Sequence, residues 1–169
     1  MKKKTAKESL SISTDVVFPG DTNALNGMFG GELLSRMDRV CYIAAKRHSE
    51  NIAVTVSVNH VTFPKSVPLG STVTIEAKVS RAFSTSMEVF ADVWTEDLFS
   101  GVKTKVNEGI YTFVAVGKDG NTLPVPELIP ETKLEKQRFK GALQRRQLSL
   151  VLSGKMLPNE ASELKSLFD

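Results

Sequence analysis

Residues 21–38 read Asp21-Thr-Asn-Ala-Leu-Asn-Gly-Met-Phe-Gly-Gly-Glu-Leu-Leu-Ser-Arg-Met-Asp38. The stretch begins as a turn-rich loop, narrows to a pair of glycines and continues into an apolar helical pattern. Glycines at the start of a helix allow a ligand to approach backbone N–H groups closely. A carboxylate two turns further along the helix, Asp38, would place an acid, a base or a nucleophile near that ligand.

A helix is predicted from Gly31 to His48. At 100° per residue the apolar residues of this segment gather on one broad arc, and most of its arginines and lysines fall on the opposite side. The apolar arc contains Leu33, Leu34, Met37, Val40, Cys41, Ala44 and Ala45. The helix therefore has a wide apolar face to bury.

The rest of the chain up to about residue 117 is typical of β-strands. Alternation of apolar and polar residues predicts strands at 9–17, 54–63, 72–79, 87–94 and 109–116. A change of the apolar phase predicts a β-bulge near Asn59-His60. One strand, one long helix and about four consecutive strands predict an α+β fold, in which a mainly antiparallel sheet is wrapped on the helix.

The C-terminal part of the chain differs in character. Residues 123–130 are rich in proline and predict an extended connector. Thr132 and Glu135 have the spacing of a capping box, which predicts the start of a final, strongly cationic helix. We therefore expect a compact domain over residues 9–130 and a helical extension over residues 131–169.

The composition is that of one soluble globular protein, with 169 residues of which 41% are apolar and 24% charged. The net charge of +3 is too small to indicate nucleic-acid binding. A single cysteine, Cys41, precludes an internal disulfide and permits a reducing compartment. Residues 1–8 are expected to be a frayed basic tail. Because no apolar run follows them and no window is long enough to span a membrane, we expect a cytoplasmic protein.

Asp38, the glycine pair and Asn23 each have a functional and a purely structural interpretation. Asp38 lies at the margin of the apolar arc, where a carboxylate partly removed from water gains basicity, but a hydrogen bond to Tyr42 would also explain it. Gly30 and Gly31 could polarise a carbonyl through their N–H groups, or form a tight turn with positive φ. Asn23 could orient water or a carbonyl, or close an Asx-turn.

Other polar residues give weaker signals, and no metal site is predicted. His48 and His60 lack the spacing of metal ligands; His48 is expected to cap carbonyls at the helix end and His60 to lie at the bulge. Cys41 is expected to be buried as a small hydrophobic residue. Ser84, Thr85 and Ser86 offer hydroxyls to a polar ligand, although a hydrophilic turn would also explain them.

Residues 10–140 contain the motifs Asp21-Thr-Asn23, Phe29-Gly-Gly31, Leu34, Met37-Asp38, Val54-Thr-Val-Ser-Val58, Ser86-Met87, Tyr111-Thr-Phe-Val-Ala-Val116 and Leu123-Pro-Val-Pro126. Together these motifs resemble the signature of hotdog-fold acyl-CoA thioesterases of the cytosolic acyl-CoA hydrolase type. This resemblance implies a hotdog fold, in which a curved antiparallel sheet wraps a long central helix, here with an added C-terminal helix. It also implies a homodimer whose sheets are continuous, and a homohexamer as a trimer of such dimers.

The resemblance implies a reaction and the residues for it. A fatty acyl-CoA would be hydrolysed to a free fatty acid and CoA, as part of fatty acid metabolism, with no cofactor besides the CoA of the substrate. By position, Asp38 would be the general base or nucleophile, and Gly31 the oxyanion donor, with Gly30 beside it in substrate binding. The site would lie between protomers, so that Asn23 assists from the other protomer.

The phosphates of the CoA would require cations. Arg81, beside the hydroxyls of Ser84, Thr85 and Ser86, would supply one such group. The basic final helix, which contains Arg145 and Arg146, is the other source of positive charge.

One feature departs from the pattern of that family. Many relatives have a glycine two or three residues after the loop asparagine, whereas this chain reads Asn23-Ala-Leu-Asn26-Gly27. Asn26 tolerates left-handed backbone geometry, so the turn can still form. The path of the loop, and with it the pose of Asn23, is the part of the resemblance that this departure affects.

Two other functions are compatible with the same fold. A non-catalytic acyl-CoA-binding or sensing protein would gain little from a basic carboxylate on the helix. A hotdog dehydratase acting on enoyl-CoA would need a catalytic histidine beside an acid, and neither histidine is placed for that role. The sequence therefore favours the hydrolase.

Overall fold

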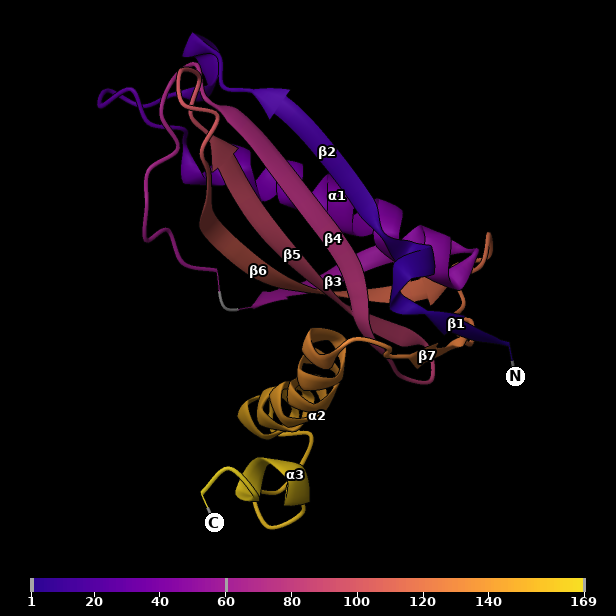
Figure 1. Cartoon of the computed structure of the whole chain (residues 1–169). Helices are drawn as coiled ribbons and strands as arrows, with labels where there is room; N and C mark the ends of the chain where they lie inside the picture. Colours follow the sequence, from indigo (N-terminus) through magenta and orange to yellow (C-terminus); the bar gives the residue numbers. More distant parts are fainter. Residues whose placement is uncertain (1, 60, 169) are drawn as a thin grey trace.

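The computed structural model describes residues 2–59 and 61–168. A five-stranded antiparallel sheet curves along the long helix α1 (Gly30–Ser49), as Figure 1 shows. The strand order is β2 (Ser11–Val16), β4 (Thr72–Ala82), β5 (Ser86–Glu96), β6 (Lys103–Val116) and β3 (Ile52–Asn59). The predicted α+β arrangement of one strand, one helix and four strands is confirmed, with β2 and β3 at the two edges of the sheet.

The core lies between α1 and the concave face of the sheet. The apolar arc of α1 is buried there at Leu33, Met37, Val40, Cys41, Ala44 and Ala45. Alternate residues of the central strands cover it, among them Ile75, Val79, Met87, Val89, Val93 and Phe113. Burial of each large side chain contributes about 1.5–3 kcal/mol, so apolar packing holds α1 in place.

Strand β3 does not bury its valines. Val54, Val56 and Val58 are each about half exposed, while Thr55 pairs with the buried Phe113 of β6 and therefore faces α1. The β-bulge falls at Val56, because the register with β6 shifts between Thr55 and Ser57. The sequence thus predicted the bulge, near Asn59-His60, three residues further along the chain than the structure has it. The expected position of His60 lies outside the described residues.

The N-terminus is not a frayed tail, contrary to expectation. Strand β1 (Lys3–Thr5) pairs in parallel with β7 (Glu127–Ile129), and a single 3-10 turn, η1 (Ala6–Ser9), follows it. The Nζ of Lys4, a buried lysine, donates to the carbonyl of Arg47 and lies 2.8 Å from Glu50. This basic segment forms a strand because it pairs with β7, which lies more than 120 residues away in the sequence.

The C-terminal helix α2 (Lys133–Leu152) begins where the capping box predicts. Thr132 Oγ1 accepts a hydrogen bond from the N–H of Glu135, whose carboxylate accepts one from the N–H of Thr132. Figure 1 shows α2 against one end of the sheet, followed by the short α3 (Ser162–Lys165). Asp92 and Glu88 of β5 bond to α2, and they alternate with the core residues that face α1. Helix α2 therefore covers part of the convex face.

Candidate active site

Asp38 sits on α1 facing the edge strand β3. Its Oδ1 accepts a hydrogen bond of 2.8 Å from Thr55 Oγ1, and the aspartate is only partly buried. Among the described residues no hydrogen bond joins Asp38 to Tyr42, so the structural alternative with that partner is wrong. Thr55 fixes one carboxylate oxygen and leaves Oδ2 for a water molecule or a substrate, which suits proton transfer or nucleophilic attack.

The charge of Asp38 also acts on two neighbouring groups. Burial, and then the nearby carboxylate of Asp38, raises the pKa of the Cys41 thiol well above its usual value. Burial and nearby negative charge, including that of Asp38, likewise raise the pKa of Tyr111, whose hydroxyl donates to the carbonyl of Leu34. Both groups stay protonated near neutral pH, so neither is an activated nucleophile.

The first N–H groups of α1, the helix that also bears Asp38, have no partner within the helix. Phe29 is the N-cap and provides no side-chain cap, and the first intrahelical bond runs from Leu33 N–H to its carbonyl. The N–H groups of Gly30 and Gly31 are therefore unpaired within the helix and carry the positive end of its dipole. Neither glycine has positive φ, so the tight-turn alternative is wrong.

The two glycines differ in what surrounds them. A Cβ on Gly30 would lie 3.1–3.4 Å from the ring atoms of Phe63, so this position is closely packed. A Cβ on Gly31 would meet nothing within 4 Å, and the residue is exposed. The position of Gly31 is therefore open on its side-chain side, whereas the ring of Phe63 fills the space at Gly30.

The loop before α1 is closed by Asn23. Its Oδ1 accepts hydrogen bonds from the N–H groups of Leu25 at 2.9 Å and Gly27 at 3.3 Å, which is the Asx-turn alternative. The Nδ2 group takes no part in this turn and can donate elsewhere. Asn26 has a φ of 56°, as expected from the departure from the family pattern. In the described residues no hydrogen bond joins Asn23 to Asp38 of the same chain.

A partly buried arginine of α1 fixes the loop against the helix. Arg36 lies 2.8 Å from Asp21, 2.9 Å from Glu32 and 3.2 Å from Asp15. The Phe18 N–H that bonds to Asp21, together with Arg36, lowers the pKa of the Asp21 carboxyl. Because the pairs join strand, loop and helix, the path of the Asn23 loop is set relative to α1.

Arg81 lies away from Asp38 and is engaged by α2. Its guanidinium donates to the carbonyl of Phe139 and stacks over the Phe139 ring, 4.1 Å from the centroid. Ser86 is buried on the convex face, where its Oγ accepts from Arg146. Ser84 is exposed, and its carbonyl accepts from the N–H of Val125.

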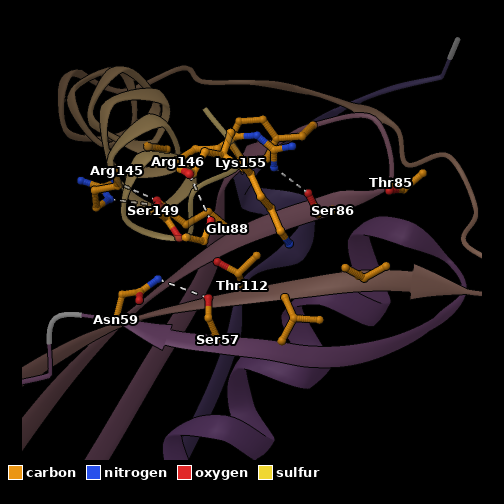
Figure 2. A pocket seen from close by; sticks show the side chains of 16 residues that line it. Ser57, Asn59, Thr85, Ser86, Glu88, Thr112, Arg145, Arg146, Ser149 and Lys155 are labelled. Carbon is orange, nitrogen blue, oxygen red and sulfur yellow. Dashed lines mark hydrogen bonds and ion pairs between the residues drawn. The ribbon is translucent and has the colours of Figure 1, made fainter. Parts of the chain in front are cut away.

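A cavity of about 430 Å³ lies between α2 and the convex face, and Figure 2 shows its lining. We call it the α2 pocket. Its polar lining consists of Ser57, Asn59, Thr85, Ser86, Glu88, Thr112, Arg145, Arg146, Ser149, Ser153 and Lys155. Within one chain, the sheet separates this pocket from Asp38, so the structure gathers the predicted residues into two places rather than one.

Thr55 is the residue of the site that sequence reasoning did not assign. It alternates with valines in Val54-Thr-Val-Ser-Val58, so the pattern indicates a strand with Thr55 on the polar side. The signal would have been that β3 is an edge strand whose valines stay about half exposed. That property depends on strand order, which alternation does not report.

His48 caps a carbonyl, but not one of its own helix. Its Nε2 lies 2.8 Å from the carbonyl of Pro126, and the side chain is fully buried. Over the described chain, no group of three or more His, Cys, Asp or Glu side chains is arranged to hold a metal ion. No described helix is long and apolar enough to cross a membrane.

Comparison with known proteins gives one consistent family. The model of the thioesterase superfamily matches residues 25–98. An uncharacterised acyl-CoA thioester hydrolase of Bacillus subtilis is 39% identical over 139 residues, 82% of this chain and 81% of that protein. A more distant human relative is described as a cytosolic acyl coenzyme A thioester hydrolase.

Solved structures agree with this result. An acyl-CoA hydrolase from Bacillus cereus has a TM-score of 0.87 and 38% identity, covering 99% of this chain and 98% of that one. The Staphylococcus aureus acyl-CoA hydrolase, solved with butyryl-CoA and CoA, has a TM-score of 0.84 and 32% identity, covering 90% and 95%. That enzyme was also solved with an aspartate, an asparagine or a threonine changed to alanine. Other similar structures are described as hexameric thioesterases.

Proposed function

This chain belongs to the acyl-CoA thioester hydrolases of the thioesterase superfamily, and we propose that it hydrolyses fatty acyl-CoA to a free fatty acid and CoA at Asp38. The family, the hotdog fold and the hydrolase activity expected from the motifs are confirmed. The observation that carries the site is the hydrogen bond of 2.8 Å between Thr55 and Asp38, beside a helix whose first N–H groups are unpaired. The three residue types changed in the S. aureus enzyme are those of Asp38, Asn23 and Thr55, which supports the proposal.

The proposed chemistry uses these groups in sequence. The N–H of Gly31 binds the thioester oxygen as negative charge develops on it. The Asp38 carboxylate either takes a proton from an attacking water or attacks the carbonyl carbon itself. The C–S bond then breaks, and the CoA thiolate leaves and is protonated. Where Asp38 itself attacked, water then hydrolyses the acyl-aspartate anhydride, which releases the fatty acid and restores the carboxylate. Thr55 holds the carboxylate in position throughout, and the step requires no further cofactor.

We propose further that the complete site spans two protomers in a homodimer. The backbone edge of β3 is unpaired along the described strand, so a second copy of β3 would pair with it and extend the sheet. Asn23 of the partner subunit would then supply the amide that is missing beside Asp38. The hexameric relatives support assembly of such dimers into a homohexamer. Analytical ultracentrifugation tests this, since a monomer at micromolar concentration contradicts it.

The proposed setting is the cytoplasm and fatty acid metabolism. The single buried cysteine suits a reducing compartment, and the cytosolic human relative supports the location. We propose no nucleic-acid or membrane partner. Localisation of a tagged chain in its host cell tests the compartment.

Thiol release from acyl-CoAs of graded chain length tests the function. The parent protein is expected to release thiol, and Asp38→Ala to lose about 10²–10⁴-fold in kcat, because the base or nucleophile is removed. Asp119→Asn, which changes an exposed carboxylate in a turn, is the matched control and should be fully active. If the parent binds acyl-CoA but releases no thiol at any chain length, the protein is a sensor instead.

A single turnover in ¹⁸O-labelled water separates the two roles of Asp38. If Asp38 attacks and water then opens the anhydride at the Asp38 carbonyl, the label enters the Asp38 carboxylate, whereas general-base catalysis places it only in the released acid. Mass spectrometry of the peptide that contains Asp38 reads the result.

A further inference from the structure

We infer that Tyr111 is a positioning residue for the reaction, because its hydroxyl holds in place the turn of α1 that carries Asp38. The hydroxyl donates a hydrogen bond of 3.2 Å to the carbonyl of Leu34, which lies one turn before Asp38 on the helix. Tyr111 therefore acts through Asp38 rather than on the substrate. The inference rests on the proposed function, since it requires Asp38 to be the reacting carboxylate.

The acceptor is the same backbone group that binds the N–H of Asp38. In an α-helix the carbonyl of residue i accepts the N–H of residue i+4, so the carbonyl of Leu34 accepts that of Asp38. The hydroxyl of Tyr111 uses the second lone pair of this oxygen. One carbonyl thus connects the backbone of Asp38 to the sheet, and any movement of this turn along β6 breaks the connection.

Two neighbouring strands hold this turn of α1. Strands β3 and β6 lie side by side (Figure 1), and Thr55 of β3 pairs with Phe113 of β6. Tyr111 lies two residues before Phe113, on the same buried face of β6. Thr55 therefore fixes the carboxylate of Asp38, and Tyr111 fixes the backbone that carries it. The two contacts together tie both ends of the aspartate to the sheet.

The ring of Tyr111 is closely packed, so its hydroxyl has a defined position. The side chain is only 1% exposed. A Cβ on Gly109 would lie 3.2 Å from Cε2 of Tyr111 and 2.6 Å from Cε of Met37, so these two side chains fill the space over the glycine. Burial, and then nearby negative charge, raises the pKa of Tyr111, so the hydroxyl stays protonated and donates. A side chain locked in this way can hold a catalytic group precisely.

The hydroxyl of Tyr111 contributes more to position than to folding. Phenylalanine would keep the ring and its packing, and the carbonyl of Leu34 would keep its bond within the helix. No buried polar group is then left unpaired. The net contribution of one such bond to stability is small, because the hydroxyl binds water in the unfolded chain. Loss of the hydroxyl should therefore affect the reaction more than the stability.

The variant Tyr111→Phe tests the inference. We expect kcat for butyryl-CoA to fall about 3- to 10-fold, with KM within about twofold of the parent and a urea midpoint close to that of the parent. Ile75→Val, which removes one methylene from the same buried face of the sheet, is the matched control. It should lower the urea midpoint at least as much and keep the kcat of the parent. Unchanged kcat in Tyr111→Phe overturns the inference, and so does an equal loss of kcat in Ile75→Val.

A double variant with Asp38→Ala shows whether Tyr111 acts through the carboxylate. If it does, Tyr111→Phe has no further effect on the residual rate of Asp38→Ala, whereas the same fold-loss in both backgrounds overturns the inference. An impaired Asp38→Ala beside a normal Tyr111→Phe overturns the inference alone. A fully active Asp38→Ala overturns the proposed function, and the inference with it.

Discussion

The two faces of the sheet hold their helices by different forces. On the concave face, α1 packs through apolar side chains, and Phe113 and Met37 are completely buried there. On the convex face, α2 is held by charged pairs, of which Arg138–Asp92 and Arg145–Glu88 are both bidentate. The first contact follows from burial of area and depends little on pH or salt, whereas the second depends on the protonation and partners of a few groups.

This difference matches the role proposed for the concave face. A catalytic carboxylate must be held within a few tenths of an ångström, and a rigid apolar core beneath α1 achieves that. On the convex face, by contrast, a few charged pairs join α2 to β5. The predictions below test whether the two faces respond as separately as their contacts suggest.

Phe113→Ala should have the largest effect on stability. The side chain is fully buried against α1, and its removal leaves a cavity in the core. We expect a loss of about 3–5 kcal/mol in the free energy of unfolding, measured by urea denaturation. A loss below 1 kcal/mol would show that α1 does not depend on apolar packing at this point.

Arg145→Ala should have an intermediate effect. Its removal leaves the Glu88 carboxylate, which is 6% exposed, with Ser80 as its remaining side-chain donor. We expect a loss of about 1–3 kcal/mol in the free energy of unfolding. The double variant Arg145→Ala/Glu88→Gln should recover part of that loss, because it no longer buries an unpaired charge. No recovery would contradict the pairing.

His48 should make the end of α1 sensitive to mild acid, at a smaller scale. Burial, only partly opposed by the hydrogen bond with Pro126, lowers the pKa of His48 from its ordinary 6.5. As pH falls below 6.5 the unfolded chain takes up a proton that the folded chain does not, so stability decreases, by at most about 1.4 kcal/mol per pH unit. Comparing unfolding free energies at pH 7.5 and 5.5, His48→Gln should lose this part of the slope. An unchanged slope would contradict it.

The Arg138–Asp92 pair of the convex face should not respond in that range. Burial opposes ionisation of Asp92, but the hydrogen bonds from Arg138 and Lys105 outweigh it and lower the pKa of Asp92 below its usual 3.8. Stability from this group is present above pH 3.8 and is lost only as pH falls through the still lower folded pKa. Mild acid thus acts through His48 at the end of α1, whereas the contribution of Asp92 is lost only in strong acid.

Lys78→Ala should have the smallest effect. Its Nζ lies 3.3 Å from Glu135 of α2, and more than a third of its side chain is exposed. Solvent screening limits such a pair to about 0–1 kcal/mol. A change in the melting temperature larger than that of Arg145→Ala would mean that the buried pairs do not dominate the contact of α2.

Much of the fold could be predicted because it depends on neighbours in the sequence. The apolar arc of α1 and the capping box of Thr132 are set by residues within one or two turns, and both are confirmed. The left-handed Asn26 is a property of a single residue. Such features are fixed by steric and hydrogen-bonding preferences that act over a few residues, so the sequence shows them directly.

The sequence alone therefore determined the position of helix α1 and the succession of strands along the chain. It also identified the protein family, in large part through the motifs of residues 21–38. Only the tertiary structure decided that β3 is an edge strand, in which Thr55 bonds to Asp38 and the valines stay about half exposed. It likewise gave residues 3–5 a strand partner and separated Ser86 from Asp38 by the thickness of the sheet. These outcomes depend on which distant segments meet when the chain closes on itself, and periodicity, which reports only local geometry, contains no information about that.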